Sequence, residues 1–377
     1  MERQAAIELV MALLTAGRRA DVARLTELYA DDAVAVSPLF GEVRGAAAIA
    51  ATWQRLSQTQ PDFSAELTHI LADGDRVAVL GTVAATDRAG WFGLPPTGGP
   101  IGYKIVLLFT VADGRIVRDE RIYDSAGVLE RLEKARLDKE LRTAADVQRT
   151  LLSRTAHATR WSETVGSSVP CRATGGDFFA FVDLPADAVG ILLGDVSGKG
   201  PAAALLAAML QGMFETEAAA SGGPAEALTR INRRLAARHL ESRYATMTYG
   251  VLSSDGRLVY ANAGHNPPAL ITRQGVRRLT CGGPAVGMFE ASFFEEDQLR
   301  LADGDTLVLF TDGVTEARNR RDEEYGEERL VDCLTQAAHD PPRGLLDQVF
   351  ASVRDFCGDA DPNDDITVAV TRYRDGG

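Results

Sequence analysis

The sequence has few cysteines, and none of them stands near another. The four are Cys171, Cys281, Cys333 and Cys357, without a Cys-x-x-Cys pair, and this spacing argues against both a disulfide framework and a zinc site. Long apolar runs are also missing, since none approaches the roughly 18 residues that span a bilayer. The first residues, MERQAAIELVMALLTAG, lack a signal-peptide pattern. We therefore expect a cytoplasmic protein with no membrane partner.

A surplus of basic residues is absent as well. Lys and Arg number 40 against 53 Asp and Glu, which gives a formal net charge of −13. Binding to nucleic acid requires basic surfaces that contact phosphates, so we expect no nucleic-acid partner. The acidic residues suggest another use, because divalent cations prefer oxygen ligands. With 377 residues the chain is long enough for two or three domains.

The chain falls into three segments, and its pattern is that of an α+β protein. Residues 1–127 place helical patterns before strand-like ones, which predicts a curved antiparallel sheet with helices on one face. Residues 128–160 are charged and free of proline and glycine, which predicts a helical linker. Residues 161–377 combine seven strand-like segments with four helical ones, which predicts a sandwich of sheets with helices outside.

The linker contains a short apolar seam. Its members alternate steps of four and three residues: Leu137, Leu141, Ala144, Gln148 and Leu151. A coiled coil between two copies of the chain and a single helix lying on a domain both fit this pattern.

The stretch GDVSGKG, residues 194–200, has two competing interpretations. A nucleotide-binding P-loop needs four residues between its first glycine and the Gly-Lys pair, followed by Ser or Thr. Here Gly194 and Gly198 are one residue too close, and Gly200 follows Lys199. Asp195 would also repel the phosphates. The alternative is that Asp195 binds a metal ion.

The metal interpretation gains support because the same arrangement recurs. Asp177 and the pair Asp364-Asp365 come just before apolar strand patterns, whereas Asp195 and Asp312 come at the ends of such patterns. A single aspartate beside a turn is ordinary. Four strand-end aspartates predict a shared acidic cluster, within one metal shell, whose mutual repulsion divalent cations would neutralise.

This pattern resembles the PPM family of metal-dependent protein serine/threonine phosphatases, in its SpoIIE/RsbU-like branch. The matching stretches occur in the family's order: PCRATGGDFF, ILLGDVSGKGPAAALLAAML, NRRLAARHLESRYATMTYGVL, YANAGHNPPALI, DTLVLFTDGVTEARN, YGEERL and NDDITVAV. The resemblance implies an α-β-β-α sandwich with metals in a cleft at one end. It also implies hydrolysis by water held between two Mn²⁺ or Mg²⁺ ions, with no protein nucleophile.

The resemblance assigns roles to individual residues. Asp195 would bridge the two ions, and the Val196 carbonyl would bind the second. Asp312 and Asp364 would complete the shell of the first ion, and Asp177 would lie by the second. Asp195, Asp312 and Asp364 are thereby the predicted catalytic residues. Asp365 is an open case, because the family admits Asn there.

Several positions depart from the family or keep two interpretations. Ser197 stands where many eukaryotic relatives have a histidine acid, and Ala180 replaces a second acidic residue. Arg172 matches a recurring arginine and is either a phosphate ligand or an ordinary surface residue. His265 is either an acid or, beside two prolines, a structural turn residue. Lys199 either attracts phosphate or is a solvated turn residue.

Residues 1–127 resemble the SnoaL-like cone fold, on the stretches FGLPPTGGPI and KIVLLFTVADGRIVRDERIYDSAGVLERL. The resemblance implies a bent sheet around a cavity, a small-molecule ligand and pairing into a homodimer. Some relatives are cyclases or isomerases that use an aspartate matching Asp124. The alternative is that Asp124 caps the following helix.

The combined hypothesis is a phosphatase acting on phosphoserine or phosphothreonine in a protein, typically a STAS-type anti-anti-sigma factor. The N-terminal domain would regulate it by moving the helices that begin at Pro201. Two alternatives stay open. One is a catalytically degenerate scaffold that senses a ligand, which the intact aspartates argue against. The other is a cyclase or isomerase in the N-terminal domain.

Overall fold

The computed structural model describes residues 3–151, 155–238 and 243–375. The chain divides into two compact units, with the boundary after Glu140. None of the described helices is both long enough and apolar enough to cross a membrane.

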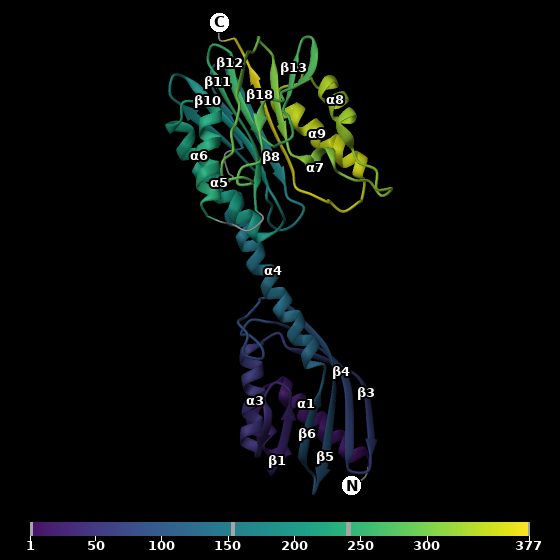
Figure 1. Cartoon of the computed structure of the whole chain (residues 1–377). Coiled ribbons are helices and arrows are strands. Elements are labelled where there is room, and N and C mark those ends of the chain that lie inside the picture. The colour runs from purple at the N-terminus through teal and green to yellow at the C-terminus, as the bar shows by residue number, and fades with distance from the viewer. Residues whose placement is uncertain (1–2, 152–154, 239–242, 376–377) are drawn as a thin grey trace. The chain divides into compact units, whose positions relative to one another are not determined.

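The N-terminal unit packs three helices on a six-stranded sheet (Figure 1). The strands run in the order β2-β1-β6-β5-β4-β3, and every neighbouring pair is antiparallel except β1 and β6. The elements are α1 (Arg3–Arg18), α2 (Val22–Leu28), β1 (Tyr29–Ser37), β2 (Gly41–Arg44), α3 (Ala46–Thr59), β3 (Ser64–Asp73), β4 (Arg76–Thr86), β5 (Pro100–Ala112) and β6 (Arg115–Ile122). The sheet is therefore mixed, not purely antiparallel as predicted.

The difference comes from β1 and β2, which the sequence patterns did not reveal. The helical pattern over 21–30 continues into Tyr29 and Ala30, but α2 ends at Leu28 and the chain becomes extended. Two aspartates in β1 obscure its alternation, because Asp31 and Asp32 are exposed while Ala33 and Ala35 are buried. Strands β4 and β5 alternate more regularly between buried and exposed residues, as expected for a sheet with one covered face.

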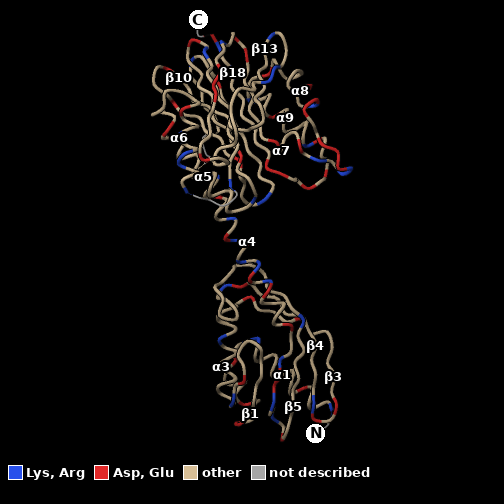
Figure 2. The backbone as a smooth tube through the Cα atoms, viewed as in Figure 1, with Lys and Arg blue, Asp and Glu red and all other residues tan. Residues whose placement is uncertain are grey.

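The predicted helical linker corresponds to α4 (Ser125–Leu151). Asp124 caps this helix: its Oδ1 accepts a hydrogen bond from the Gly127 N–H at 2.9 Å. Basic and acidic residues follow one another along the helix (Figure 2). The linker ends earlier than predicted, because β7 (Ala156–Ala158) already pairs with β8 (Ser162–Val169).

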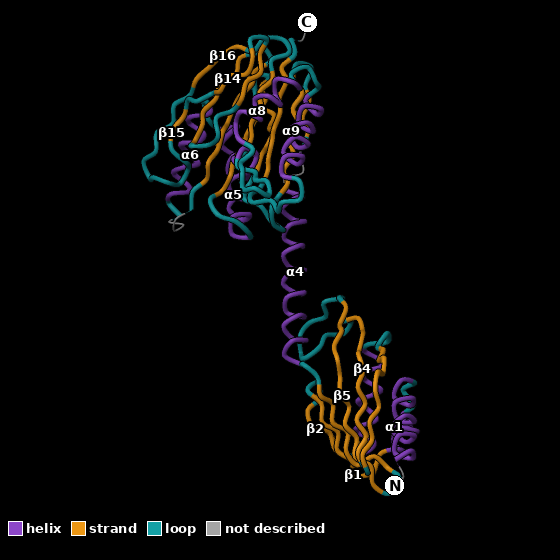
Figure 3. Tube along the Cα trace, turned by 90° about the vertical axis from the view of Figure 1, so that its right-hand side faces the viewer, coloured by secondary structure: helices purple, strands orange, loops and turns teal. Residues whose placement is uncertain are grey.

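The C-terminal unit is a sandwich of two six-stranded sheets with helices on both outer faces (Figures 1 and 3). One sheet has the order β15-β12-β11-β10-β9, with β16 beside β12, and the other has the order β14-β13-β17-β18-β8-β7. The first contains β9 (Phe178–Leu184), β10 (Ala188–Val196), β11 (Ala245–Ser253), β12 (Arg257–Ala263), β15 (Gly282–Gly283) and β16 (Asp297–Arg300). The second adds to β7 and β8 the strands β13 (Ala269–Thr272), β14 (Gly275–Arg278), β17 (Thr306–Phe310) and β18 (Ile366–Tyr373).

The outer layers are helical. On the first sheet lie α5 (Pro201–Ala220) and α6 (Pro224–Ala236), and on the second lie α8 (Gly326–Gln336) and α9 (Pro342–Cys357). Strand β10 is apolar along nearly its whole length because one face meets α5 and the other meets the opposite sheet. The predicted α-β-β-α sandwich is thus the fold of this unit.

Candidate metal centre

The four predicted ligands lie at strand ends on one edge of each sheet. Asp177 directly precedes β9, and Asp195 is the penultimate residue of the neighbouring strand β10. These strands are antiparallel, with Gly194 opposite Phe178, so both aspartates lie at the same edge. In the other sheet β17 and β18 are also antiparallel, which places the short helix α7 (Asp312–Thr315) beside the residue before β18, Asp365.

The carboxylates influence one another as a chain of neighbours. Burial, and then the charge of Asp195, raises the pKa of Asp177 well above its ordinary value. Burial and the charge of Asp312 raise the pKa of Asp195 to about 7. Burial and the charge of Asp364 raise the pKa of Asp312. The structure thus brings all four predicted ligands into one acidic cluster, in which few positive charges offset the negative ones.

The cluster does not form a closed metal shell. No three of the four aspartates place ligand atoms within 4.8 Å of one another, and among described residues only Cys171, Asp364 and Asp365 do so. The expectation that the four gather within one shell is therefore not met by these side-chain positions.

Asp365 supports the loop that carries Asp177. Its two carboxylate oxygens accept hydrogen bonds from the backbone N–H groups of Cys171, at 2.8 Å, and Gly176, at 2.7 Å. Asp365 therefore fixes the backbone of the GGD stretch, and we assign it a positioning role in place of metal binding.

The two glycines before Asp177 allow close approaches. A Cβ atom on Gly175 would lie 2.6 Å from Asp365 Oδ2, and one on Gly176 would lie 2.9 Å from the Val196 carbonyl oxygen. The predicted carbonyl ligand thus faces a space that only glycine leaves free. A hard oxygen donor set and carboxylates whose pKa values are raised by burial fit a divalent cation such as Mn²⁺ or Mg²⁺.

Three cationic side chains belong to or border the loops around the cluster. Lys199 Nζ lies 3.0 Å from Asp364 Oδ2 and also donates to the Asn363 carbonyl. Lys199 is thus an exposed residue that also forms an ion pair with Asp364. Arg172 is exposed, without a hydrogen bond or ion pair to any residue that the structure describes. Arg243, which sequence analysis did not select, has Nη1 3.6 Å from where a Cβ of Gly198 would lie.

His265 and Ser197 have structural contacts. The His265 ring is bonded through Nδ1 to the Thr246 hydroxyl at 2.8 Å and through Nε2 to the Phe310 carbonyl at 3.1 Å. Burial lowers its pKa to about 4, so the ring is neutral near pH 7. The Ser197 hydroxyl accepts from the Tyr244 N–H at 3.0 Å. The structural interpretation of His265 is the one that these contacts support.

Two supporting residues escaped the sequence analysis in this role. Thr311, fully buried, donates to Asp177 Oδ2 at 2.8 Å. Gln148, near the end of α4, donates to the Gly175 carbonyl at 2.7 Å and accepts from the Gly175 N–H at 3.3 Å. The position of Thr311 directly before Asp312 is the sequence feature that could have indicated it. Gln148 was marked only as a member of the linker's seam, and no sequence signal indicated this contact, because its partner lies 27 residues away.

Comparisons with known proteins match both units of the chain to families. The family model of stage II sporulation protein E (SpoIIE) matches residues 185–374, and that of the SnoaL-like domain matches residues 10–119. Protein IcfG of Synechocystis is 32% identical over 195 residues, 44% of this chain and 31% of its own. Phosphoserine phosphatase RsbU of Bacillus subtilis is 27% identical over 244 residues, 63% of this chain and 71% of its own.

Among solved structures, the SiaA-PP2C domain of Pseudomonas aeruginosa superimposes with a TM-score of 0.58 at 22% identity, and the match covers 64% of this chain and 98% of that domain. At this identity the likeness concerns the fold. The chain spans about a third of IcfG, so the activity of that whole protein is not transferred. The SpoIIE model covers half of the chain and includes three of the four strand-end aspartates. The chain therefore belongs to the SpoIIE family, with a PP2C-type phosphatase domain preceded by a SnoaL-like domain.

Proposed function

We propose that the protein is a metal-dependent phosphatase that hydrolyses phosphoserine or phosphothreonine in a protein substrate. The observation that carries this proposal is the acidic cluster at one edge of two sheets, in which burial and neighbouring charge raise the pKa values of Asp177, Asp195 and Asp312. Such clusters are typical of sites that bind divalent cations.

Asp195 with the Val196 carbonyl, Asp177, Asp312 and Asp364 would hold two Mn²⁺ or Mg²⁺ ions. When bound, such ions lower the pKa of water and stabilise negative charge on a phosphoryl group. Thr311 orients Asp177 through its hydroxyl, and Asp365 holds the loop that carries it. The exposed guanidinium of Arg172 and that of Arg243 would attract the substrate phosphate. Neutral His265, with both ring nitrogens bonded, would donate no proton.

The proposed substrate is a phosphorylated anti-anti-sigma factor of the STAS type. Support comes from the likeness to RsbU, whose name describes a phosphoserine phosphatase. An acidic site bordered by the exposed Arg172 and the half-buried Arg243 suits a phosphorylated residue presented by a folded protein.

Regulation by the SnoaL-like domain is part of the proposal. Helix α4 begins directly after the capping residue of that domain, and Gln148 near its end holds the backbone two residues before Asp177. Leu137 and Leu151 of the apolar seam are 55% and 54% exposed in the single chain. A homodimer that pairs through α4 would cover them.

Phosphate release from a phosphoserine protein, measured with and without Mn²⁺, tests the activity. We expect release by the wild type only with Mn²⁺, and a loss of at least a hundredfold in Asp195→Asn. Asp355→Asn, which makes the same change on the exposed face of α9, should keep full activity. Release without metal, or an active Asp195→Asn variant, would refute the mechanism. A folded wild type that binds Mn²⁺ but releases no phosphate would favour the scaffold alternative.

A further inference from the structure

The N-terminal unit contains a cavity whose lining is apolar apart from a few groups. Its volume is about 150 Å³, and it lies between helices α1 and α3 and the inner face of the sheet. Beside aliphatic side chains, its wall contains six aromatic ones: Phe40, Trp53, Phe63, Trp91, Tyr103 and Tyr123. The charged side chains of the lining are two arginines, Arg18 and Arg121, and no carboxylate or histidine lines it among the described residues.

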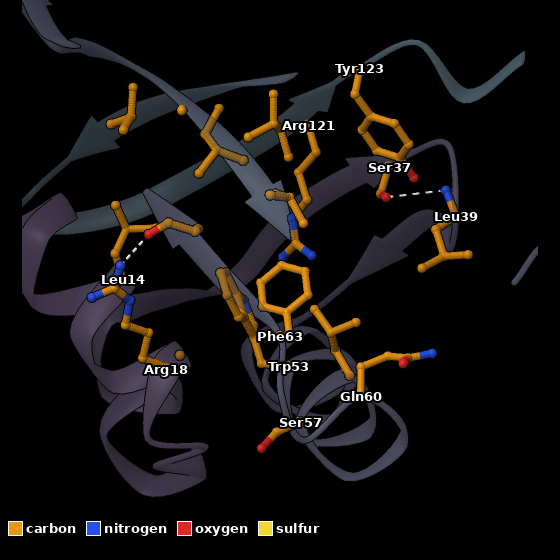
Figure 4. Close-up of a pocket in the computed structure, with 18 of the residues that line it drawn as sticks. Leu14, Arg18, Ser37, Leu39, Trp53, Ser57, Gln60, Phe63, Arg121 and Tyr123 are labelled. Atoms are coloured by element: carbon orange, nitrogen blue, oxygen red, sulfur yellow. Dashed lines mark hydrogen bonds between the residues drawn. The ribbon is translucent and has the colours of Figure 1, made fainter. Parts of the chain in front are cut away.

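Arg121 is a built part of this cavity. It is 9% exposed, and its guanidinium lies 4.5 Å from the centre of the Trp53 ring. Figure 4 shows the side chain directed from the sheet toward the rings of Phe63 and Trp53. Nη2 lies 3.0 Å from Asp119 Oδ2, and that oxygen also accepts from the Tyr29 hydroxyl at 2.8 Å. This network fixes the guanidinium in one orientation.

One donor of this guanidinium is left over. Arg121 Nε is buried and has no hydrogen-bond partner among the described residues. Buried N–H groups without a partner are rare in folded proteins, because desolvation is then uncompensated. Oδ1 of its ion-pair partner Asp119 is buried without a partner as well, so the Arg121–Asp119 pair keeps one donor and one acceptor unbonded among the described residues.

The charges around the cavity favour an anionic acceptor. Asp119 lies behind Arg121, outside the lining, and balances one of the two arginines. Arg18 is exposed at the cavity and donates to the Ala65 carbonyl, which is uncharged. Arg18 is therefore the arginine of the lining whose charge no described carboxylate balances, and a ligand carboxylate matches a guanidinium in charge and shape.

The volume limits the size of the ligand. A cavity of this volume lined by apolar side chains holds one benzene molecule in an engineered protein. The aromatic side chains of the wall favour an aromatic ring as ligand, through stacked and edge-on contacts. We propose that the cavity binds a single-ring aromatic carboxylate, with the carboxylate toward the guanidinium groups of Arg18 and Arg121 and the ring among the aromatic side chains.

The same lining argues for binding without turnover. Asp124, the residue that the SnoaL-like resemblance matches to a catalytic aspartate, caps α4 and is not part of the lining. Arg121, the buried arginine of the lining, stays protonated and cannot remove a proton from a ligand. The cavity therefore fits a sensor better than a cyclase or isomerase.

Tryptophan fluorescence of the full chain, titrated with benzoate, tests the proposal. Trp53 and Trp91 line the cavity, whereas the third tryptophan, Trp161, lies in the core of the other unit and supplies a constant background. We expect a saturable change with benzoate, and at least tenfold weaker binding of benzyl alcohol, which has the ring without the charge. Arg121→Gln should weaken benzoate binding at least tenfold.

A second variant keeps the Arg121–Asp119 pair intact in case Arg121→Gln does not fold. Leu67→Phe adds a ring to the cavity wall and should weaken benzoate binding at least tenfold. Leu71→Phe, on the same strand but 57% exposed, should bind as the wild type does. Equal affinity for benzoate and benzyl alcohol, unchanged binding in Leu67→Phe, or no response up to about 10 mM benzoate would overturn the proposal.

Discussion

Replacing Gln148 by alanine tests how strongly the end of α4 supports the metal loop. The side chain makes two hydrogen bonds to the buried peptide of Gly175, at 2.7 and 3.3 Å, two residues before Asp177. Each bond contributes about 1 kcal/mol, so up to about 2 kcal/mol of loop ordering is removed. Water replaces part of this, and about 1.4 kcal/mol corresponds to a tenfold change in an equilibrium constant. We expect about tenfold more Mn²⁺ to be needed for half-maximal phosphatase activity.

The assay is phosphate release as a function of Mn²⁺ concentration, with calorimetry of Mn²⁺ binding on the same samples. Saturating Mn²⁺ should restore most of the activity, because Gln148 touches no proposed metal ligand. Thr150→Ala is the matched control on α4, since that hydroxyl bonds only within the helix, to the Asp146 carbonyl. An unchanged Mn²⁺ midpoint in Gln148→Ala would show that the hydrogen bonds between Gln148 and the Gly175 backbone do not support the site.

Three further predictions concern the cluster itself. Gly176→Ala places a Cβ 2.9 Å from the Val196 carbonyl oxygen and should lower the free energy of unfolding in urea by about 1–3 kcal/mol. The control Gly212→Ala, inside α5 with no atom within 4 Å of the new Cβ, should be neutral or stabilising. Equal effects of the two changes would contradict the close packing at Gly176. Asp195→Asn should raise the melting temperature of the metal-free protein at pH 8. The pKa of Asp195 is raised to about 7 in the folded state, so the wild type loses stability as the pH rises from about 4 to 7. A gain in melting temperature that persists at pH 4 would point to another cause. Lys199→Met removes the ammonium beside Asp364 and should tighten Mn²⁺ binding up to about fivefold by calorimetry, which corresponds to the small free energy of a partly exposed ion pair. Weaker Mn²⁺ binding would mean that Lys199 helps to hold the site together.

Sequence patterns located the C-terminal fold because its strands are long and apolar. The segment AVGILLGDV is buried along β10, and the helices after Pro201 and Pro224 begin where proline is suited to a first turn. In the N-terminal unit the patterns missed β1, since its exposed Asp31 and Asp32 break the alternation and the preceding helical period overlaps Tyr29. The parallel pairing of β1 with β6 is set by tertiary packing, which local patterns do not encode.

The acidic cluster was predictable because each member lies beside a strong strand signal. Supporting residues were not, because their partners are distant in sequence. Gln148 meets Gly175, Thr311 meets Asp177, and Asp365 meets Cys171 across 194 positions. Asp364 and Asp365 are adjacent in the chain, yet Asp365 accepts hydrogen bonds from backbone N–H groups whereas Asp364 forms an ion pair with Lys199. Only the folded arrangement separates a residue that supports the loop from one that faces the site.

The charges of the cluster bear on the number of cations. The aspartates that influence one another are Asp177, Asp195, Asp312, Asp364 and Asp365, and the ammonium within ion-pair distance belongs to Lys199. With all five ionised, four negative charges remain, which is the charge that two divalent cations supply. One cation would leave two negative charges of the cluster unbalanced. We therefore expect calorimetry to give two Mn²⁺ ions per chain, and a stoichiometry of one ion would contradict this charge balance.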